Sequence, residues 1–397
     1  MIAEKMVDLV SGSSLIRKMF EEGKQLSEIH GAENVCDFSL GNPNLAAPET
    51  VNKAFEAILK EENSVFVHGY MNNSGYEDVR DAVAQSLNRR FATTLSAKNI
   101  VMTVGAAGGM NVAMKALMNP GDEVIAFAPF FGEYRCYASN VDAKLVVVPP
   151  NPPTFIPDPE VLAKYITNKT KMVIINSPNN PTGVVYPEST IIAMAKVLEE
   201  KQKEFGTEIY LFADEPYREL VYDKSVEVPF LIKYYANTIV GYSWSKSLSL
   251  PGERIGYLAV SEKIADFEML TSALNVATRI LGFVNAPSLQ QRMIARCVDE
   301  VADLEFYKKN RDALYNGLLE MGYTCVKPDG AFYFWVKSPL ENDGEFVEMA
   351  KKYLLLTVPG SAFGCAGYFR ISYCVSHEVI QTSLPKFKML MDEVKGL

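Results

Sequence analysis

Short apolar runs alternate with longer amphipathic segments between residues 99 and 260, and this alternation limits the folds that the chain can adopt. The expected strands lie at 99–104, 123–128, 144–148, 171–176, 209–214 and 238–243. The expected helices lie at 105–118, 131–139, 158–166 and 187–205. In the last helix, Ile191, Met194, Ala195 and Leu198 recur at the spacing of one helix face. Strands that alternate with helices predict an α/β fold, with a mainly parallel sheet flanked by helices.

The C-terminal part of the chain follows a different pattern. Residues 290–397 combine helical patterns with short strands such as GAFYFWV and YFRISYC, which Pro and Gly turns separate. We expect a smaller α+β domain there. The predicted division is a large domain over 49–285 and a small domain over 1–48 and 286–397. No repeat or flexible linker interrupts the chain, so the two domains are expected to pack tightly.

Composition excludes several classes of protein. A net charge of −9 and a pI near 5.2 argue against a general nucleic-acid or anionic-membrane binder. The N-terminus lacks the apolar core of a signal peptide, and no run approaches the ~18 apolar residues of a membrane span. The six cysteines form no C-x-x-C pair and no metal-type cluster with the three histidines. These features predict a cytoplasmic protein with reduced thiols, without a metal site, a membrane or a nucleic-acid partner.

Polar and turn residues follow four of the expected strands. These segments are GAAGG at 105–109, SPNNPTG at 177–183, DEPY at 214–217 and SWSK at 243–246. In parallel sheets, ligands bind at the carboxyl ends of the strands. The sequence therefore predicts a ligand site where these four segments meet.

Each segment alone allows more than one interpretation. Small residues at 105–109 let backbone N–H groups approach an anion at a helix N-terminus, or serve close packing only. Asn180 precedes a proline, which is also typical of a plain turn. Asp214 ends a buried strand, where a carboxylate suits a cationic ring nitrogen, a metal, an arginine or a helix N-cap. Tyr217 lies three residues further on and presents a phenol to the same place.

Lys246 is a single amine among hydroxyl-bearing residues. Most lysines are solvated surface charges, but here Ser243, Ser245 and Arg254 supply groups that suit a phosphate. An amine, a phosphate site, a carboxylate and an amide together are the set of functional groups needed to bind pyridoxal 5'-phosphate. The amine of lysine forms an imine with the aldehyde of this cofactor, and the ring acts as an electron sink.

The segment YSWSKSLSLPGERIGY at 242–257 resembles the lysine signature of the class I/II aminotransferases, which are fold-type I enzymes that use pyridoxal phosphate. FSLGNPN at 38–44 is similar to their N-terminal substrate loop. SPNNPTG and ADEPY resemble their mid-chain motifs, and GAFYFWV and YFRISYC their C-terminal ones. The resemblance covers nearly the whole chain, with the key residues in the order 180, 214, 246 and 370.

The resemblance assigns a role to each matching residue. It implies that Lys246 carries the cofactor as a Schiff base and that Asp214 pairs with the pyridine nitrogen. Asn180 and Tyr217 match the pair that binds the ring 3-hydroxyl. The phosphate cup is matched by Ser243, Ser245, Arg254 and the backbone of Ala106 and Ala107. Arg370, assisted by the backbone of Gly41 and by Asn180, resembles the group that binds the substrate α-carboxylate.

Two aromatic residues also match the family pattern. Phe131 stands where the family places the aromatic that stacks on the ring, and Tyr70 matches a tyrosine that reaches the phosphate of the neighbouring subunit. The second match implies a homodimer with shared active sites. For both residues a purely structural role is the alternative.

The resemblance implies an aminotransferase that moves the amino group of an L-amino acid to a 2-oxo acid such as 2-oxoglutarate, by a ping-pong mechanism. The substrate is expected to be aspartate-like or broad. Ala107 stands where some dicarboxylate-specific relatives have a basic residue, which leaves Arg279 as a candidate for a distal carboxylate, or as an interface or surface arginine. The expected apolar lining of the pocket comprises Leu15, Ile16, Phe332 and Tyr333.

Two other classes share the fold. C–S β-lyases and related eliminating enzymes use the same cofactor but release ammonia and pyruvate. A non-catalytic, ligand-sensing half of a transcription regulator is the third reading. It fits less well because the aminotransferase pattern begins within the first forty residues.

Overall fold

The computed structural model describes residues 2–11 and 15–396, without the side chains of residues 8, 11, 15–18 and 20. Its largest sheet has seven strands in the order β2-β8-β7-β6-β5-β3-β4. In that spatial order the strands are Ile100–Thr103, Gly256–Val260, Thr238–Ser243, Tyr210–Asp214, Thr170–Asn176, Glu123–Phe127 and Lys144–Val148. All neighbours are parallel except β8, which runs antiparallel to both β2 and β7. The mainly parallel sheet is therefore confirmed.

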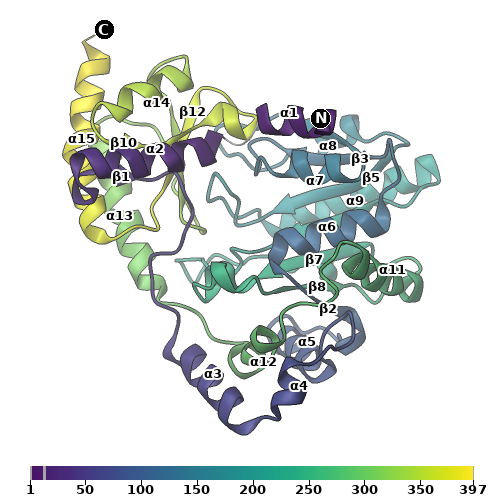
Figure 1. Cartoon of the computed structure of the whole chain (residues 1–397). Coiled ribbons are helices and arrows are strands. Elements are labelled where there is room, and N and C mark those ends of the chain that lie inside the picture. The colour runs from purple at the N-terminus through teal and green to yellow at the C-terminus, as the bar shows by residue number, and fades with distance from the viewer. Residues whose placement is uncertain (1, 12–14, 397) are drawn as a thin grey trace.

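Helices cover both faces of this sheet (Figure 1). On one face pack α6 (Gly105–Leu117), α7 (Tyr134–Asn140) and α11 (Phe267–Ile280). The other cluster of buried side chains includes α3 (Glu49–Glu61), α5 (Glu77–Phe91), α8 (Pro159–Tyr165), α9 (Glu188–Phe205) and α12 (Ser288–Cys297). The short helices α4 (Ser64–His68) and α10 (Trp244–Ser247) complete this part. The four residues predicted for one face of α9, Ile191, Met194, Ala195 and Leu198, are all buried.

A second, smaller group of elements packs around its own core. A three-stranded antiparallel sheet, β11-β12-β9, contains Val358–Pro359, Tyr368–Ser372 and Tyr333–Lys337. A parallel pair joins β1 (Cys36–Asp37) to β10 (Leu355–Leu356). The helices of this group are α2 (Leu15–His30), α13 (Leu304–Glu320), α14 (Asp343–Lys351) and α15 (His377–Lys395), and α1 (Glu4–Ser11) precedes them. The beginning and the end of the chain thus meet in one α+β unit.

The position of α12 bears on the division of the chain. Its buried side chains, among them Met293 and Ile294, belong to the core cluster of the large sheet. The division into domains remains our proposal, and this packing favours a boundary that follows α12. None of the helices in the described part of the chain combines the length and apolar character that a membrane crossing needs.

One strand of the large sheet was not among the predicted strands. Residues 256–260 form β8, which lies between β2 and β7 and reverses the direction of the chain. Because β8 is antiparallel, its first residues lie at the edge where its neighbours end. This reversal brings the segment just before β8, which contains Arg254, to the carboxyl edge of the parallel strands.

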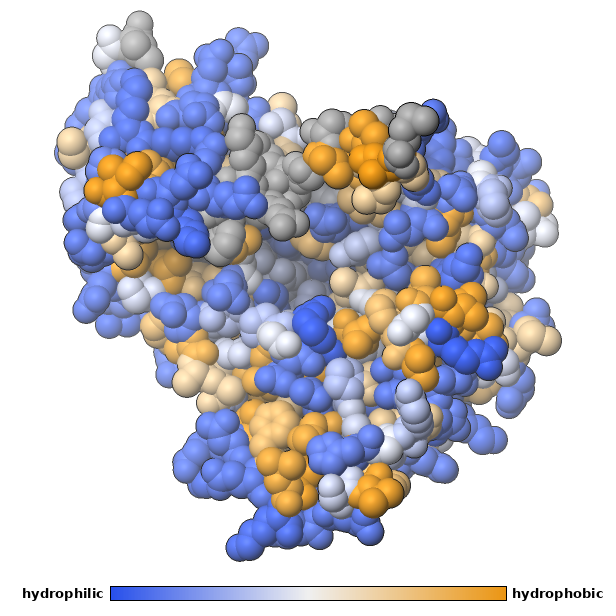
Figure 2. Space-filling model, in the orientation of Figure 1, coloured by the Kyte–Doolittle hydropathy of each residue, from blue (hydrophilic) through white to orange (hydrophobic). Residues whose placement is uncertain are grey.

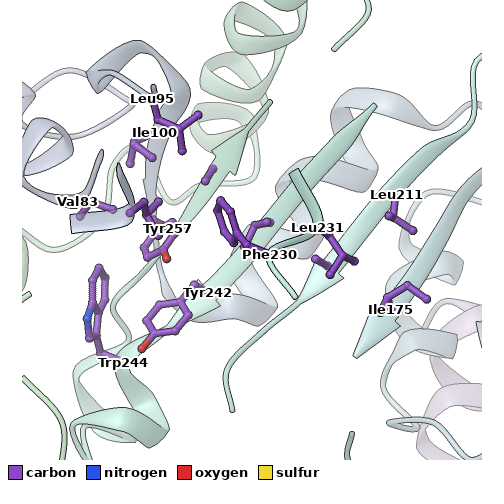
Figure 3. Close-up of a cluster of buried hydrophobic side chains, with 14 of the residues drawn as sticks. Val83, Leu95, Ile100, Ile175, Leu211, Phe230, Leu231, Tyr242, Trp244 and Tyr257 are labelled. Carbon is purple, nitrogen blue, oxygen red and sulfur yellow. The ribbon is translucent and has the colours of Figure 1, made fainter. Parts of the chain in front are cut away.

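The residues around the end of β7 alternate between two environments. Tyr242 and Trp244 point into the core, where the ring of Tyr242 stacks on Tyr257 of β8 at 5.0 Å between centroids (Figure 3). Ser243 and Ser245, at the intervening positions, line a cavity. Tyr242 and Ser243 end β7, where successive side chains point to opposite faces of the sheet, and Trp244 and Ser245 begin α10. Aromatic residues therefore anchor the segment that carries the serines and Lys246.

Candidate active site

A cavity of about 280 Å³ lies at the carboxyl edge of the large sheet, next to the smaller α+β unit. All four polar segments that follow the predicted strands contribute to it. Its lining consists of Leu40, Gly41, Ala106, Ala107, Met110, Phe131, Tyr134, Tyr137, Asn176, Asn180, Asp214, Pro216, Tyr217, Ser243, Ser245, Lys246, Pro251, Arg254, Tyr333 and Arg370. The expectation that ligand-binding chemistry gathers after these strands therefore agrees with the structure.

Lys246 lies on α10, the short helix that follows β7. Its Nζ donates a hydrogen bond of 2.5 Å to the carbonyl oxygen of Gly41, 205 positions away in the chain. The ring of Phe332 lies 5.6 Å from the same nitrogen. Burial lowers the pKa of the Lys246 amine to about 8, and the nearby guanidinium groups of Arg254 and Arg370 lower it as well. A buried amine with this pKa is partly uncharged near neutral pH.

Asp214 is the last residue of β6 and is buried. Burial raises the pKa of its carboxyl to about 6, while a 2.5 Å hydrogen bond from the hydroxyl of Tyr134 lowers it. Asn176 donates to the backbone carbonyl of Asp214 at 2.8 Å and accepts from the backbone N–H of Asn180 at 2.7 Å. Asn176 of β5 thus holds the backbone of Asp214 and Tyr134 of α7 holds its carboxylate, whose raised pKa a cationic partner would bring down.

Hydroxyl groups gather at one end of the cavity. The Oγ atoms of Ser243 and Ser245 lie 2.5 Å apart, and Nη1 of Arg254 donates to Ser245 Oγ at 3.4 Å. Beside them, α6 begins at Gly105 without a side-chain N-cap. Its first backbone N–H groups lack an intrahelical partner and favour an anion. We call Ser243, Ser245, Arg254 and residues 105–107 the hydroxyl end.

Gly105 leaves no space for a side chain at the hydroxyl end. A Cβ at this position would lie 2.4 Å from Nη2 of Arg254, and the backbone φ of +74° favours glycine. The glycine therefore lets the guanidinium of Arg254 approach the first turn of α6.

Arg370, on β12, lies at the opposite end of the cavity. Its Nη1 donates to Oδ1 of Asn180 at 3.1 Å, and its Nη2 donates to the carbonyl of Ser39 at 2.5 Å. The guanidinium carbon lies 4.7 Å from the ring centroid of Tyr333 and 4.8 Å from that of Phe363. The Nε atom is buried and has no hydrogen-bond partner among the residues that the structure describes. We call Ser39, Gly41, Asn180, Tyr333 and Arg370 the arginine end.

Tyr217 forms a buried pair of phenols with Tyr333 of the arginine end. Their hydroxyl oxygens lie 2.8 Å apart, and both side chains line the cavity. Burial raises the pKa of Tyr217 well above its usual range. Gly41 closes the other side of Tyr333, because a Cβ at Gly41 would lie 2.0 Å from the Tyr333 hydroxyl oxygen.

Most of the predicted site residues line this one cavity, but some lie elsewhere. Tyr70 is 93% exposed on the surface, and Arg279 is exposed near the end of α11. Phe332 is fully buried behind Lys246 and is not among the lining residues. The side chains of Leu15 and Ile16 lie outside the described residues.

Sequence reasoning missed several lining residues, above all Tyr134. It lies three positions after Phe131, at the start of α7, and a spacing of three places side chains on one helix face. Tyr137 follows after another three positions and lines the cavity too. This repeat in PFFGEYRCY was a usable signal. Nothing in the sequence indicated that Asn176, inside a strand, would hold Asp214.

Comparison with known proteins gives a consistent result. Residues 33–386 match the family model of aminotransferase class I and II. An aspartate aminotransferase of Pyrococcus horikoshii is 28% identical over 99% of this chain and 98% of its own length. A probable aspartate/prephenate aminotransferase of Thermus aquaticus is 32% identical over 87% of this chain and 89% of its own length.

Among solved structures, an amino transferase from Eubacterium rectale superposes with a TM-score of 0.96. It is 46% identical and covers 99% of this chain and 98% of its own length. The match to the family model spans all the segments that form the cavity, including the four polar segments at the strand ends. The chain therefore belongs to the class I and II aminotransferases and is a transaminase with the fold-type I architecture.

Proposed function

We propose that this transaminase uses pyridoxal 5'-phosphate to move the amino group of an L-amino acid to a 2-oxo acid such as 2-oxoglutarate, by a ping-pong mechanism. The observation that carries the proposal is the presence of three ionisable residues in one cavity, the partly buried Lys246 and the buried Asp214 and Arg370. Buried ionisable groups with shifted pKa values are typical of catalytic sites.

The donor set fits the cofactor that the family is known to use. The serines and Arg254 at the hydroxyl end, with the free N–H groups of α6, suit a phosphate dianion. Asp214 suits a protonated ring nitrogen, which would lower the cost of ionising this buried carboxyl. When bound, pyridoxal phosphate supplies an aldehyde and a ring that takes up the charge released at the amino-acid Cα.

Lys246 is the proposed general base and acid. Because burial lowers its pKa to about 8, roughly a tenth of the amine is uncharged at pH 7 and can accept the Cα proton. The carbonyl of Gly41 accepts a hydrogen bond from the same nitrogen and thereby orients the amine.

Arg370 is the proposed site for the α-carboxylate of the substrate. A guanidinium has five N–H donors, and two of them bind Asn180 and Ser39. Within residues 2–11 and 15–396, the buried Nε–H has no partner. A carboxylate would satisfy the remaining donors and would offset the burial of the positive charge.

The substrate side chain meets a lining that is largely apolar, with Leu40, Phe131 and Met110. Among the described lining residues the cations are Lys246, Arg254 and Arg370, each of which already has a proposed role. A distal carboxylate would need a cation from outside this lining, such as Arg279 of a second copy. We therefore propose aspartate-like or broad specificity, in line with the names of the relatives from Pyrococcus and Thermus.

We also propose a homodimer in which Tyr70 reaches the neighbouring site. Tyr70 is 93% exposed, and the helices α3, α4 and α11 with the residues after α11 carry further exposed apolar side chains: Leu59, Val65, Phe66, Val276, Ile280 and Phe283. Asn73 donates to the carbonyl of Val284 and so links the segment after Tyr70 to the end of α11. Figure 2 shows orange patches on this face around α3, α4 and α11. Apolar patches of this kind mark interaction surfaces.

The test is a visible spectrum of the cofactor-loaded protein mixed with single amino acids in the absence of any oxo acid. For an aminotransferase, one amino acid removes the absorption band of the lysine-bound cofactor stoichiometrically, and a 2-oxo acid restores it. Accumulation of ammonia and pyruvate with a persistent band would instead identify a β-lyase. If no band forms after addition of pyridoxal phosphate, the assignment of Lys246 is wrong.

A further inference from the structure

Tyr333 contacts two other residues that line the cavity, Tyr217 and Arg370. Its side chain is 2% exposed and stands on β9, directly beside β12, where Arg370 pairs in register with Trp335. Its hydroxyl lies 2.8 Å from the hydroxyl of Tyr217, and its ring faces the guanidinium of Arg370 at 4.7 Å. One side chain therefore contacts the phenol and the arginine to which different roles are proposed.

The ring of Tyr333 restricts the orientation of Arg370. With Phe363 at 4.8 Å, the guanidinium has two aromatic neighbours, and its Nη atoms are tied to Asn180 and Ser39. Cation–π contacts with buried rings stabilise a guanidinium that has lost its water. With two aromatic contacts and two hydrogen bonds, the side chain has little freedom to turn the remaining N–H groups away from a ligand.

The hydroxyl of Tyr333 determines how Tyr217 can use its proton. Each phenol has one proton, and the other phenol is the hydrogen-bond partner that the structure gives it. When a ligand oxygen lies beside Tyr217, both protons find acceptors if Tyr333 donates to Tyr217 and Tyr217 donates to the ligand. A chain of two such bonds polarises the second donor and strengthens it.

We propose that Tyr333 is a positioning residue with two separable functions, in which its ring fixes Arg370 for the substrate carboxylate and its hydroxyl directs the Tyr217 proton toward the bound cofactor. This inference rests on the proposed function and adds a residue that positions Arg370 and Tyr217 for it. Gly41 is part of the same arrangement, because its lack of a side chain leaves room for the Tyr333 hydroxyl.

Two substitutions separate the functions. Tyr333→Leu removes the aromatic face and is expected to weaken binding of maleate to the cofactor-free protein by about tenfold or more in calorimetry, with a similar rise in KM for the amino acid. Tyr333→Phe keeps the ring, so the affinity for maleate is expected to stay within about threefold of the wild type. In the cofactor-loaded Tyr333→Phe protein, the pH midpoint of the visible absorption is expected to move upward, because the donation from Tyr217 is weaker.

The matched controls are Tyr368→Leu and Tyr368→Phe. Tyr368 lies on the same small sheet, two residues from Arg370, and is not a lining residue. Both are expected to leave maleate affinity and the absorption midpoint unchanged. Tyr333→Met, which keeps apolar volume without an aromatic face, replaces Tyr333→Leu if the latter does not fold.

Each arm has an outcome that overturns one function. Wild-type maleate affinity in Tyr333→Leu or Tyr333→Met would contradict the role of the ring, and an unchanged midpoint in Tyr333→Phe would contradict the role of the hydroxyl. Failure of the proposed function is distinguishable, because the wild-type protein would then transaminate no amino acid. The calorimetric arm, which needs neither cofactor nor turnover, would still report on the Tyr333–Arg370 contact.

Discussion

The two ends of the cavity are built in different ways. At the hydroxyl end, Ser243, Ser245 and Arg254 come from one stretch of twelve residues, which β8 turns back to the sheet edge beside residues 105–107 at the start of α6. At the arginine end, Ser39, Asn180, Tyr333 and Arg370 come from four distant segments of the chain. The first end depends on a local turn, whereas the second depends on how the small α+β unit packs against the large sheet.

The amine between the two ends gives the largest expected effect. Lys246→Ala removes both the proposed cofactor anchor and the proposed general base, so turnover is expected to fall by about 10⁴-fold or more. Steady-state transamination measures this loss. Lys263→Ala, on the loop that follows β8, is the control and should retain full activity. A purified Lys246→Ala protein that transaminates at the wild-type rate would refute the proposed role.

Gly41→Ala tests the arginine end. The added Cβ would lie 2.0 Å from the hydroxyl oxygen and 2.9 Å from Cζ of the buried Tyr333, so one of the two segments must move. We expect kcat/KM to fall about 100-fold, because small displacements of positioned groups are costly in catalysis. The control is Gly252→Ala near the hydroxyl end, where a Cβ would meet nothing within 4 Å. Equal activity of the two variants would mean that the packing around Tyr333 tolerates displacement.

Gly105→Ala tests the hydroxyl end. The new Cβ would lie 2.4 Å from Nη2 of Arg254, in a backbone conformation with φ of +74°. The end of an arginine side chain can move, so we expect a smaller effect, a loss of about tenfold in affinity for pyridoxal phosphate at roughly 1–2 kcal/mol of strain. Equilibrium dialysis measures it. A matching loss of affinity for maleate would show that the two ends are not independent.

Tyr134→Phe gives the smallest expected effect and concerns the acid between the ends. Because burial raises the pKa of Asp214 from 3.8 to about 6, its contribution to the stability of the cofactor-free protein is fully present below pH 3.8 and is lost as the pH rises through about 6. Removing the Tyr134 hydroxyl, which stabilises the charged form, raises this pKa further.

The free energy of unfolding of the Tyr134→Phe protein is therefore expected to be about 1–2 kcal/mol lower than that of the wild type at pH 7.5, with a smaller difference at pH 4.5. Thermal unfolding at the two pH values measures this difference. In an Asp214→Asn background the pH dependence of the effect should vanish. If it persists there, another titrating group is responsible.

The sequence predicted the parallel strands and the four polar segments because periodicity and turn residues are local properties. It missed β8 and its antiparallel direction. A short apolar run directly after a glycine does not show where in the sheet a strand will pair or in which direction it will run. The pairing of the Tyr134 hydroxyl with Asp214 and that of Tyr333 with Tyr217 also escaped prediction. Both are contacts between segments whose separation in the chain gives no period or spacing to detect.

The reversal at β8 has a consequence for how the enzyme can change. Because the short segment from the end of β7 to the start of β8 carries Lys246, both serines and Arg254, an insertion in that segment would disturb the proposed cofactor anchoring and the proposed proton transfer together. The residues around Arg370 stand on separate strands and loops, so they can be exchanged one at a time. Laboratory evolution of new substrate ranges should therefore accumulate its changes around the scattered segments and leave residues 242–257 untouched.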